Sequence, residues 1–299
     1  MRKPVRIALR IVGGLLGLVL LVALVTSAIS EMRQRKHYDV AGKAVAIPSD
    51  SASMARGKAL ATLAGCTGCH TPTLAGMTMI DQFPMARLAS ANLTRGAGGI
   101  GATYTDADWD RAVRHGIKRD GTPIFIMPSH EYNRISDDEF GRILAYVKSV
   151  PPVDRTPAPR RIYPLARALH VFGAPIVPAE KLDHTRQANP QPPAGATMAY
   201  GEYLAGACGF CHGADLGGQK VGGEPGAPPS PPIGPSSVVA RWTEAQFFQT
   251  MRTGVTPEGR TLRPQYMPWP EIGHLRDEEL RALQMYLKQP VSQTEKAGS

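Results

Sequence analysis

The stretches Cys66-Thr67-Gly68-Cys69-His70 and Cys208-Gly209-Phe210-Cys211-His212 decide the fold of this 299-residue chain. Together they contain all four of its cysteines, so none is left over for a disulfide or an isolated thiol. Each cysteine pair has the same spacing and is followed at once by a histidine. The whole thiol content therefore serves one kind of chemistry, and it does so twice.

The chain repeats itself around these two motifs. Met127 lies 61 residues after Cys66, and Met267 lies 59 residues after Cys208. From each methionine onward the next 19 residues align without a gap, and both methionines are followed by proline. Each repeat predicts an N-terminal helix, the CxxCH turn, a long loop, a middle helix, a methionine loop and a C-terminal helix.

Particular residues support these predicted helices. Thr105 and Thr243 are expected N-caps of the two middle helices, each followed by an acidic residue that suits the helix dipole. Gly57 and Gly201 lie early in the N-terminal helices. A glycine there would let another helix approach closely, and we expect the C-terminal helix of each repeat to be that partner.

The N-terminus predicts a membrane anchor. Residues 1–10 carry four Lys/Arg, and residues 11–29 form an uncharged apolar run of 19 residues. As a helix this run would span about 28 Å, close to the roughly 30 Å core of a bilayer. A cleaved signal peptide is the alternative, with Thr26-Ser27-Ala28 as a small-residue cleavage site, but the apolar core of a signal peptide is usually shorter.

An uncleaved anchor and a cleaved signal peptide would both export the rest of the chain. The cationic leader is expected to stay in the cytoplasm. In a bacterium the N-terminus would then be cytoplasmic, and both repeats would face the periplasm from the inner membrane.

The net charge of +9 does not indicate nucleic-acid binding. Residues 1–36 hold seven Lys/Arg against Glu31 alone, so they contribute +6 and leave only +3 for the remaining 263 residues. No basic stripe is interleaved with aromatic residues. The aromatic fraction of 6% is low for two cores, which is compatible with a buried cofactor in each.

A CxxC pair followed by histidine is typical of covalent haem attachment, in which the thiols add to the vinyl groups and the histidine lies under the iron. A zinc site would need ligands from both motifs across 142 residues, and a thioredoxin-like pair needs a βαβ context that neither motif has. We therefore predict two covalently bound haem c groups. The attachment residues are Cys66, Cys69, Cys208 and Cys211, and the proximal ligands are His70 and His212.

The repeat also selects the sixth ligands of the two irons. Only Met127 and Met267 occupy the same position in both halves, so we predict them as the distal axial ligands. Met251 and Met285 are expected in helix cores, and His130 is a weaker competitor without an equivalent in the second half. The remaining histidines are expected on the surface or in loops: His37, His115, His170, His184 and His274.

Residues 54–153 resemble the class I cytochrome c domains in the cytochrome subunits of membrane-bound alcohol and gluconate dehydrogenases. The motifs that carry the resemblance are Arg56-Gly57, Cys66–His70, Ala91-Asn92-Leu93-Thr94, Gly98-Gly99-Ile100-Gly101, Tyr104-Thr105, Ala112-Val-Arg114-His-Gly116, Arg119-Asp-Gly121, Met127-Pro128 and Val150-Pro-Pro-Val153. The second repeat is similar but more generic. The resemblance implies an all-α fold, His/Met haems, and relay of electrons from a dehydrogenase towards a respiratory oxidase.

The predicted architecture is therefore all-α, with two tandem class I-like cytochrome c domains behind an N-terminal transmembrane helix. The expected segments are a leader and anchor at 1–36, a first domain at 53–151, a Pro/Arg-rich linker at 152–197, a second domain at 198–290 and a tail at 291–299. Within the linker, the apolar stretch 162–178 is expected to pack against a domain.

Methionine opposite histidine fills the iron coordination sphere, which favours electron transfer over catalysis. The predicted function is a relay between a dehydrogenase or quinol-oxidising complex and a terminal oxidase. Two alternatives stay open: a cytochrome subunit whose active site lies on another chain, and a dihaem peroxidase-type enzyme, which would need one open iron site.

Overall fold

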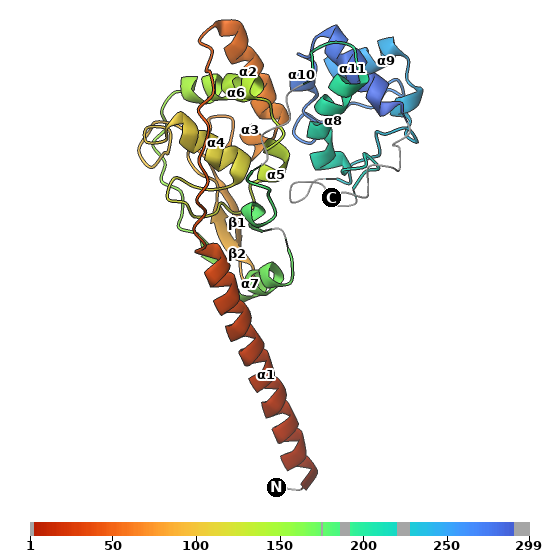
Figure 1. Cartoon of the computed structure of the whole chain (residues 1–299). Helices are drawn as coiled ribbons and strands as arrows, with labels where there is room; N and C mark the ends of the chain where they lie inside the picture. The colour runs from red at the N-terminus through yellow and green to blue at the C-terminus, as the bar shows by residue number, and fades with distance from the viewer. Residues whose placement is uncertain (1–2, 175, 186–191, 220–227, 290–299) are drawn as a thin grey trace. The chain divides into compact units, whose positions relative to one another are not determined.

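The computed structural model describes residues 3–174, 176–185, 192–219 and 228–289, and they are mainly helical (Figure 1). The α-helices are α1 (Lys3–Gln34), α2 (Ser51–Leu63), α3 (Cys66–His70), α4 (Asp106–His115), α5 (Ser129–Tyr132), α6 (Asp137–Ser149), α7 (Pro164–Val171), α8 (Met198–His212), α9 (Glu244–Thr253), α10 (Trp269–Ile272) and α11 (Asp277–Leu287). The strands are β1 (Thr78–Gln82), β2 (Ala86–Ala89) and β3 (Arg161–Ile162), and short 3₁₀ turns lie at η1 (Pro178–Glu180) and η2 (Val239–Arg241).

The sheet corrects the all-α prediction. β1 and β2 form an antiparallel hairpin in the loop after the first motif, and β3 from the predicted linker pairs with β2 at Ala86↔Ile162. The buried side chains of Ala86, Leu88 and Ile162 in this sheet form a small cluster with Ala166 of α7. Strands of two to five residues are too short to show a clear period-2 pattern, which is why the sequence did not reveal them.

The chain divides into two compact units. Unit 1 comprises residues 1–46, 67–134 and 147–187, and unit 2 comprises residues 47–66, 135–146 and 188–299. Unit 1 thus contains α1, α3 without Cys66, α4, α5, the sheet and α7, whereas unit 2 contains α2, most of α6, and α8 to α11. The tandem-domain boundaries expected from the repeat stay a prediction.

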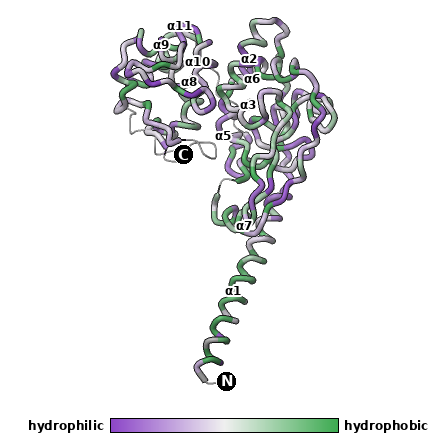
Figure 2. Tube along the Cα trace, turned by 180° about the vertical axis from the view of Figure 1, so that it is seen from behind, coloured by the Kyte–Doolittle hydropathy of each residue, from purple (hydrophilic) through white to green (hydrophobic). Residues whose placement is uncertain are grey.

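In unit 1, α1 is hydrophobic along most of its length (Figure 2). Residues 4–34 form the one helix among the described residues that is long and apolar enough to cross a membrane. The last turns of α1 pack on α7, where Ser30 Oγ lies 3.1 Å from His170 Nδ1 and Arg167 donates to the Ser27 carbonyl at 3.2 Å. Ile162 also pairs with Ala86 of β2, and Val177 packs on Ile117, so the prediction that residues 162–178 pack against a domain is confirmed.

An extended segment leads from α1 across α4. A Cβ at Gly42 would lie 1.8 Å from the carbonyl oxygen of Ala107, so only glycine fits this close approach. The backbone N–H of Lys43 donates to the Asp110 carboxylate at 2.8 Å. The segment therefore holds α1 to the same helix that precedes the methionine loop.

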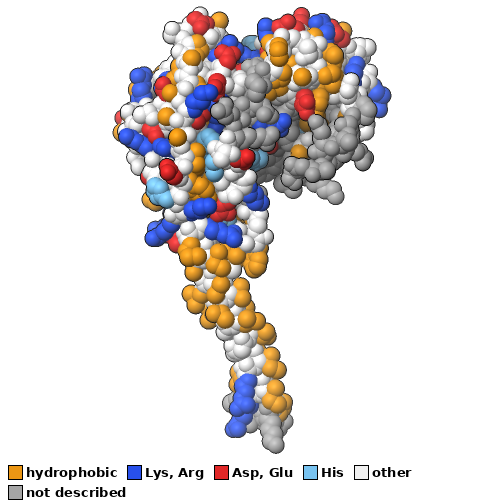
Figure 3. Space-filling model, in the orientation of Figure 1, with side chains coloured by type: hydrophobic (Ala, Val, Ile, Leu, Met, Phe, Trp, Pro, Cys, Tyr) orange, Lys and Arg blue, Asp and Glu red, His pale blue; other side chains and the backbone are white. Residues whose placement is uncertain are grey.

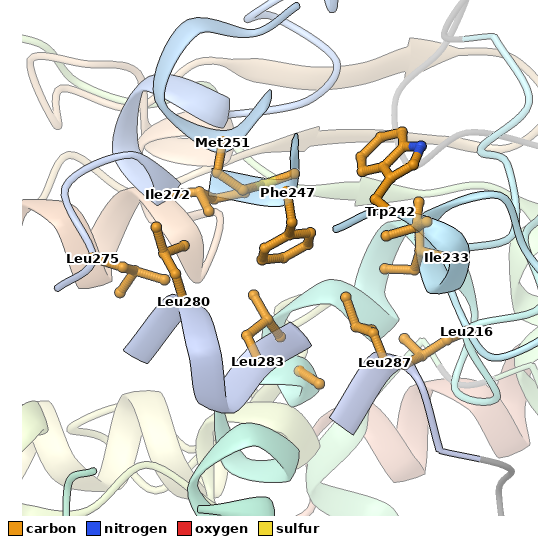
Figure 4. Packing of buried hydrophobic residues seen from close by; sticks show 12 residues of the cluster. Leu216, Ile233, Trp242, Phe247, Met251, Ile272, Leu275, Leu280, Leu283 and Leu287 are labelled. Carbon is orange, nitrogen blue, oxygen red and sulfur yellow. The ribbon is translucent and has the colours of Figure 1, made fainter. Parts of the chain in front are cut away.

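The core of unit 2 gathers side chains from α9, α10 and α11 around Phe247 (Figure 4). Leu280, Leu283 and Leu287 of α11 point into this cluster, in accord with their spacing on one helical face (Figure 4). Met251 is buried in the same cluster, so its predicted core role is confirmed. Met285 of α11 is 38% exposed, so the same prediction was wrong for it.

The expected close approach of the N- and C-terminal helices is confirmed in both repeats, and both contacts lie within unit 2. A Cβ at Gly57 of α2 would lie 1.9 Å from the carbonyl oxygen of Arg142 in α6. A Cβ at Gly201 of α8 would lie 2.0 Å from the carbonyl oxygen of Ala282 in α11. In each repeat the missing side chain lets one helix backbone touch the next.

Candidate functional site

Both CxxCH motifs are helical. The first forms the short helix α3, and the second is the C-terminal end of α8. Residues three apart lie on the same face of a helix, so the two thiols of each motif share a side. All four cysteines are partly buried thiols and none is in a disulfide.

The histidine of each motif is fixed by a backbone carbonyl. His70 Nδ1 lies 2.8 Å from the Ala91 carbonyl oxygen, and His212 Nδ1 lies 2.7 Å from that of Pro231. A carbonyl oxygen only accepts, so Nδ1 must carry the proton and Nε2 must hold the lone pair. This arrangement orients an imidazole for metal ligation through Nε2.

Burial reinforces that assignment. It lowers the pKa of His70 and of His212 below the usual 6.5, against the opposite effect of the carbonyl hydrogen bonds. Both imidazoles are therefore neutral at pH 7, as a metal ligand must be.

The turn after each histidine has the same irregular backbone. Leu74 and Leu216 adopt positive φ angles of 55° and 57° while both side chains are buried. The N–H of Gly76 donates to the His70 carbonyl, and that of Gly218 donates to the His212 carbonyl, each at 2.8 Å. Strained leucines at matching positions indicate a conformation that is held for a function.

The two methionine loops also share a backbone conformation. Pro128 has φ −79° and ψ 61°, and Pro268 has φ −76° and ψ 55°. The next N–H donates back to the methionine carbonyl, at 2.8 Å for Met127 and 2.7 Å for Met267. These are inverse γ-turns, and each leads directly into a short helix, α5 or α10.

The structure places predicted residues of the second repeat at one core cluster, whereas for the first repeat it shows only which unit each residue belongs to. In the second, Cys208 and Met267 both pack against the core cluster of unit 2, which also contains Leu216 of the histidine turn. In the first, His70 and the half-buried Met127 both lie in unit 1. Cys66 belongs to unit 2, so the first motif straddles the division.

The donor set fits haem c better than zinc. Among the described residues, no three His, Cys, Asp or Glu side chains cluster as a metal site would require. Burial, with a smaller effect from Cys211, raises the pKa of Cys208 to about 12, so the free group is a neutral thiol. The buried Trp109 Nε1 and Ser237 Oγ lack partners in the described chain, and such donors suit haem propionates.

Other candidate residues have ordinary structural roles. His130 is exposed beside Glu131, at 3.5 Å, which does not favour it as a ligand. His170 and His115 are buried, so the expectation of surface or loop positions was wrong for them. His170 is enclosed because α7 packs on α1, some 140 residues away in sequence, which no local pattern reveals.

Sequence reasoning missed the carbonyl groups of Ala91 and Pro231. Every residue has a carbonyl, so its role depends on where the loop returns and not on the type of side chain. The nearest available signal was that both lie at similar distances, 21 and 19 residues, beyond their histidines.

Residues 54–151 match the family model described as cytochrome c. The chain is 28% identical over 274 residues to the fructose dehydrogenase cytochrome subunit of Gluconobacter japonicus, covering 79% of this chain and 52% of that protein. It is 30% identical over 280 residues to the cytochrome c subunit of alcohol dehydrogenase (quinone) of Gluconobacter oxydans, covering 83% and 56%. It is 32% identical over 182 residues to the gluconate 2-dehydrogenase cytochrome c subunit of Pantoea cypripedii, covering 55% and 38%. The chain thus spans about half the length of the first two of these relatives and less than half the length of the third.

Proposed function

Because residues 54–151 belong to the cytochrome c family and the chain is homologous to cytochrome c subunits of fructose, alcohol and gluconate dehydrogenases, we propose that it is a membrane-anchored electron carrier with two covalently bound haems. The observation that carries this proposal is the repeated pair of histidine–carbonyl bonds, at 2.8 and 2.7 Å. The family model covers only the first repeat, and the matching geometry extends the proposal to the second.

Each repeat supplies a complete set of haem-binding groups. Cys66 and Cys69 would attach one haem, with His70 as the proximal ligand, and Met127 as the distal ligand. In the second repeat these roles fall to Cys208, Cys211, His212 and Met267. A bound haem supplies a one-electron ferric/ferrous couple.

The residues of the chain would keep the ligands of this redox couple in a fixed geometry that suits electron transfer. The backbone carbonyls keep each imidazole in one tautomer and orientation, so the ligand does not reorganise between oxidation states. A thioether opposite the imidazole favours the ferrous state and leaves no open position for a substrate. The site therefore suits passing electrons and not transforming a substrate.

The apolar helix α1 supports a membrane location for this carrier. We take it as an uncleaved anchor with a cytoplasmic N-terminus, which puts both haem-binding repeats on the periplasmic face of a bacterial inner membrane. The relatives are subunits of dehydrogenases, so the electron donor would be a dehydrogenase active site on another chain, and the acceptor would lie towards a terminal oxidase.

Haem counting tests the central part of the proposal. A pyridine haemochrome assay on the purified protein should give two c-type haems per chain. The double variants Cys66→Ala/Cys69→Ala and Cys208→Ala/Cys211→Ala should each retain one. A wild-type protein with one haem or none would contradict the proposal.

Partnership needs a separate measurement. Purification in mild detergent, followed by mass spectrometry, should recover a dehydrogenase chain in stoichiometric amount. A protein that purifies alone with both haems in place would instead be a free-standing anchored carrier.

A further inference from the structure

An arginine-lined cavity lies where α1 enters the folded part of unit 1. It is open to solvent and has a volume of about 370 Å³. Its polar lining consists of Glu31, Gln34, Arg160, Arg161, Tyr163 and Arg167. These residues come from the end of α1, the strand β3 and the start of α7, so the cavity is built where three elements meet.

The cavity has an excess of positive charge. Glu31 is its one acidic residue, and Arg167 already pairs with it at 2.7 Å while Arg35 pairs with it at 2.6 Å. Within the described residues, Arg160 and Arg161 have no carboxylate within ion-pair distance. Arg160 instead lies over the ring of Phe125, 3.9 Å from its centroid. Two guanidinium groups are thus left facing an open space without an internal anion.

The position of the cavity relative to the apolar run of α1 indicates which kind of ligand would bind there. Glu31 and Gln34 lie within one to two turns of the end of the apolar run at residue 29. On α7, which packs against the same turns, Leu165 and Leu169 remain 44% and 40% exposed, and Phe172 at its C-cap is 76% exposed. Figure 3 shows Lys and Arg side chains gathered immediately beyond the apolar part of α1. Apolar side chains next to a group of arginines match the boundary between the acyl chains and the headgroups of a lipid bilayer.

From this arrangement we infer that the cavity binds the phosphate of an anionic phospholipid in the periplasmic leaflet. This rests on the proposed anchoring role of α1. Arginine suits the ligand because its planar fork donates two hydrogen bonds to a phosphate. The acyl chains would then lie along α1 and the exposed side chains of α7. A lipid held here would stabilise the junction between the anchor and the folded part of unit 1.

Short-chain lipids test this on the full-length protein with its haems, purified in a neutral detergent. Native mass spectrometry or microscale thermophoresis would compare dihexanoyl phosphatidylglycerol, dihexanoyl phosphatidylcholine and inorganic phosphate. Arg160→Gln/Arg161→Gln should weaken phosphatidylglycerol binding about 10- to 30-fold, as expected for losing two arginines near a membrane surface. Arg95→Gln/Arg263→Gln removes two exposed arginines elsewhere and should leave binding unchanged.

The outcomes separate the sources of the ligand. Equal binding of both lipids, or unchanged phosphatidylglycerol binding by the cavity variant, would overturn the inference. Inorganic phosphate that binds as tightly as phosphatidylglycerol would assign the cavity to a free anion and overturn the lipid assignment. If the double variant loses haem or melts early, Arg160→Gln alone provides the comparison, because this residue lies outside β3. Alkaline carbonate extraction tests the anchor independently, since release of the chain would refute anchoring whatever the binding result.

Discussion

The loops that follow the two CxxCH motifs differ in structure and yet end in the same ligand geometry. The first contains the hairpin of β1 and β2 and pairs with β3, whereas the described part of the second has only an isolated bridge between Gln219 and Ser230. Both return a carbonyl to the histidine at nearly equal distance. The comparison teaches that the function constrains the start and the return of each loop and leaves the path between them free.

The most severe test of this equivalence is removal of each proposed distal ligand. Met127→Ala and Met267→Ala should each abolish the methionine–iron band of one haem, so half of the near-infrared absorbance is lost in either variant. The opened iron should also bind carbon monoxide, which the wild type should not do rapidly. Absorption spectroscopy of the oxidised protein measures the band.

Met285→Leu is the matched control, because Met285 is exposed on α11 and plays no part in the proposed ligation. A full band in either alanine variant would mean that the two methionine loops are not equivalent.

The second test concerns a position where the repeats use different side chains for the same contact. Arg56 precedes Gly57 and pairs with Glu139 at 3.1 Å, while Tyr200 precedes Gly201 and donates to Glu279 at 2.8 Å. Arg56 also pairs with Glu279 at 3.0 Å, and all these residues lie in unit 2. Arg56→Met should lower the free energy of unfolding by about 3–5 kcal/mol, because it removes the cation shared by two buried carboxylates and leaves Glu279 only the longer ion pair with Arg276 at 3.4 Å.

Tyr200→Phe removes one hydrogen bond and should cost only about 1–2 kcal/mol. Urea unfolding of the haem-loaded proteins measures both changes. Equal losses would show that Arg56 acts as a simple hydrogen-bond donor.

The same cluster predicts a dependence on pH. Burial alone would raise the pKa of Glu279, but the Arg276 N–H, the Arg56 guanidinium and the Tyr200 hydroxyl together hold it below the usual 4.5. Its carboxylate therefore stabilises the fold above about pH 4.5, and that contribution is lost as the pH falls towards the lower folded value. Glu279→Gln should flatten the decline in stability as the pH falls below about 4.5. Glu244→Gln, at an ion pair with Arg281 that is exposed and screened by solvent, should flatten it much less.

The third test uses the two glycine contacts. Gly57→Val and Gly201→Val should each cost about 3 kcal/mol, because a side chain would meet a backbone carbonyl that cannot turn aside. Gly206→Ala on α8 is the control, since nothing lies within 4 Å of its would-be Cβ. It should be neutral or slightly stabilising. Thermal and urea unfolding measure these effects, and a tolerated valine at either site would contradict the close packing.

Much of this comparison could be predicted from local sequence. The paired motifs, the capping threonines and the helix glycines each act within a few residues of their own position, so the repeat made them visible. The hairpin, the burial of His170 and the carbonyl partners depend on chain segments that meet from afar. Ala86, for example, pairs with Ile162 from the predicted linker, 76 positions away. The ligand assignments themselves stay predictions until the haem and band measurements are made.

The smallest expected effect lies at the caps of the middle helices. Thr105 and Thr243 each accept from the N–H three residues on, and both form capping boxes. The third helical residue differs: Asp108 is charged, whereas Gln246 is neutral. A negative charge in the first turn stabilises a helix by about 0.3–1 kcal/mol, so Gln246→Glu should raise the free energy of unfolding by that amount at low salt. Asp108→Asn should lower it, and Thr105→Ala and Thr243→Ala should each cost about 1 kcal/mol.

The effect of salt tests whether the charge at position 246 is the cause. Because the charge effect acts through the helix dipole, added salt should reduce the gain in unfolding free energy from Gln246→Glu. A gain that persists at high salt would point instead to a better hydrogen bond to the Thr243 N–H.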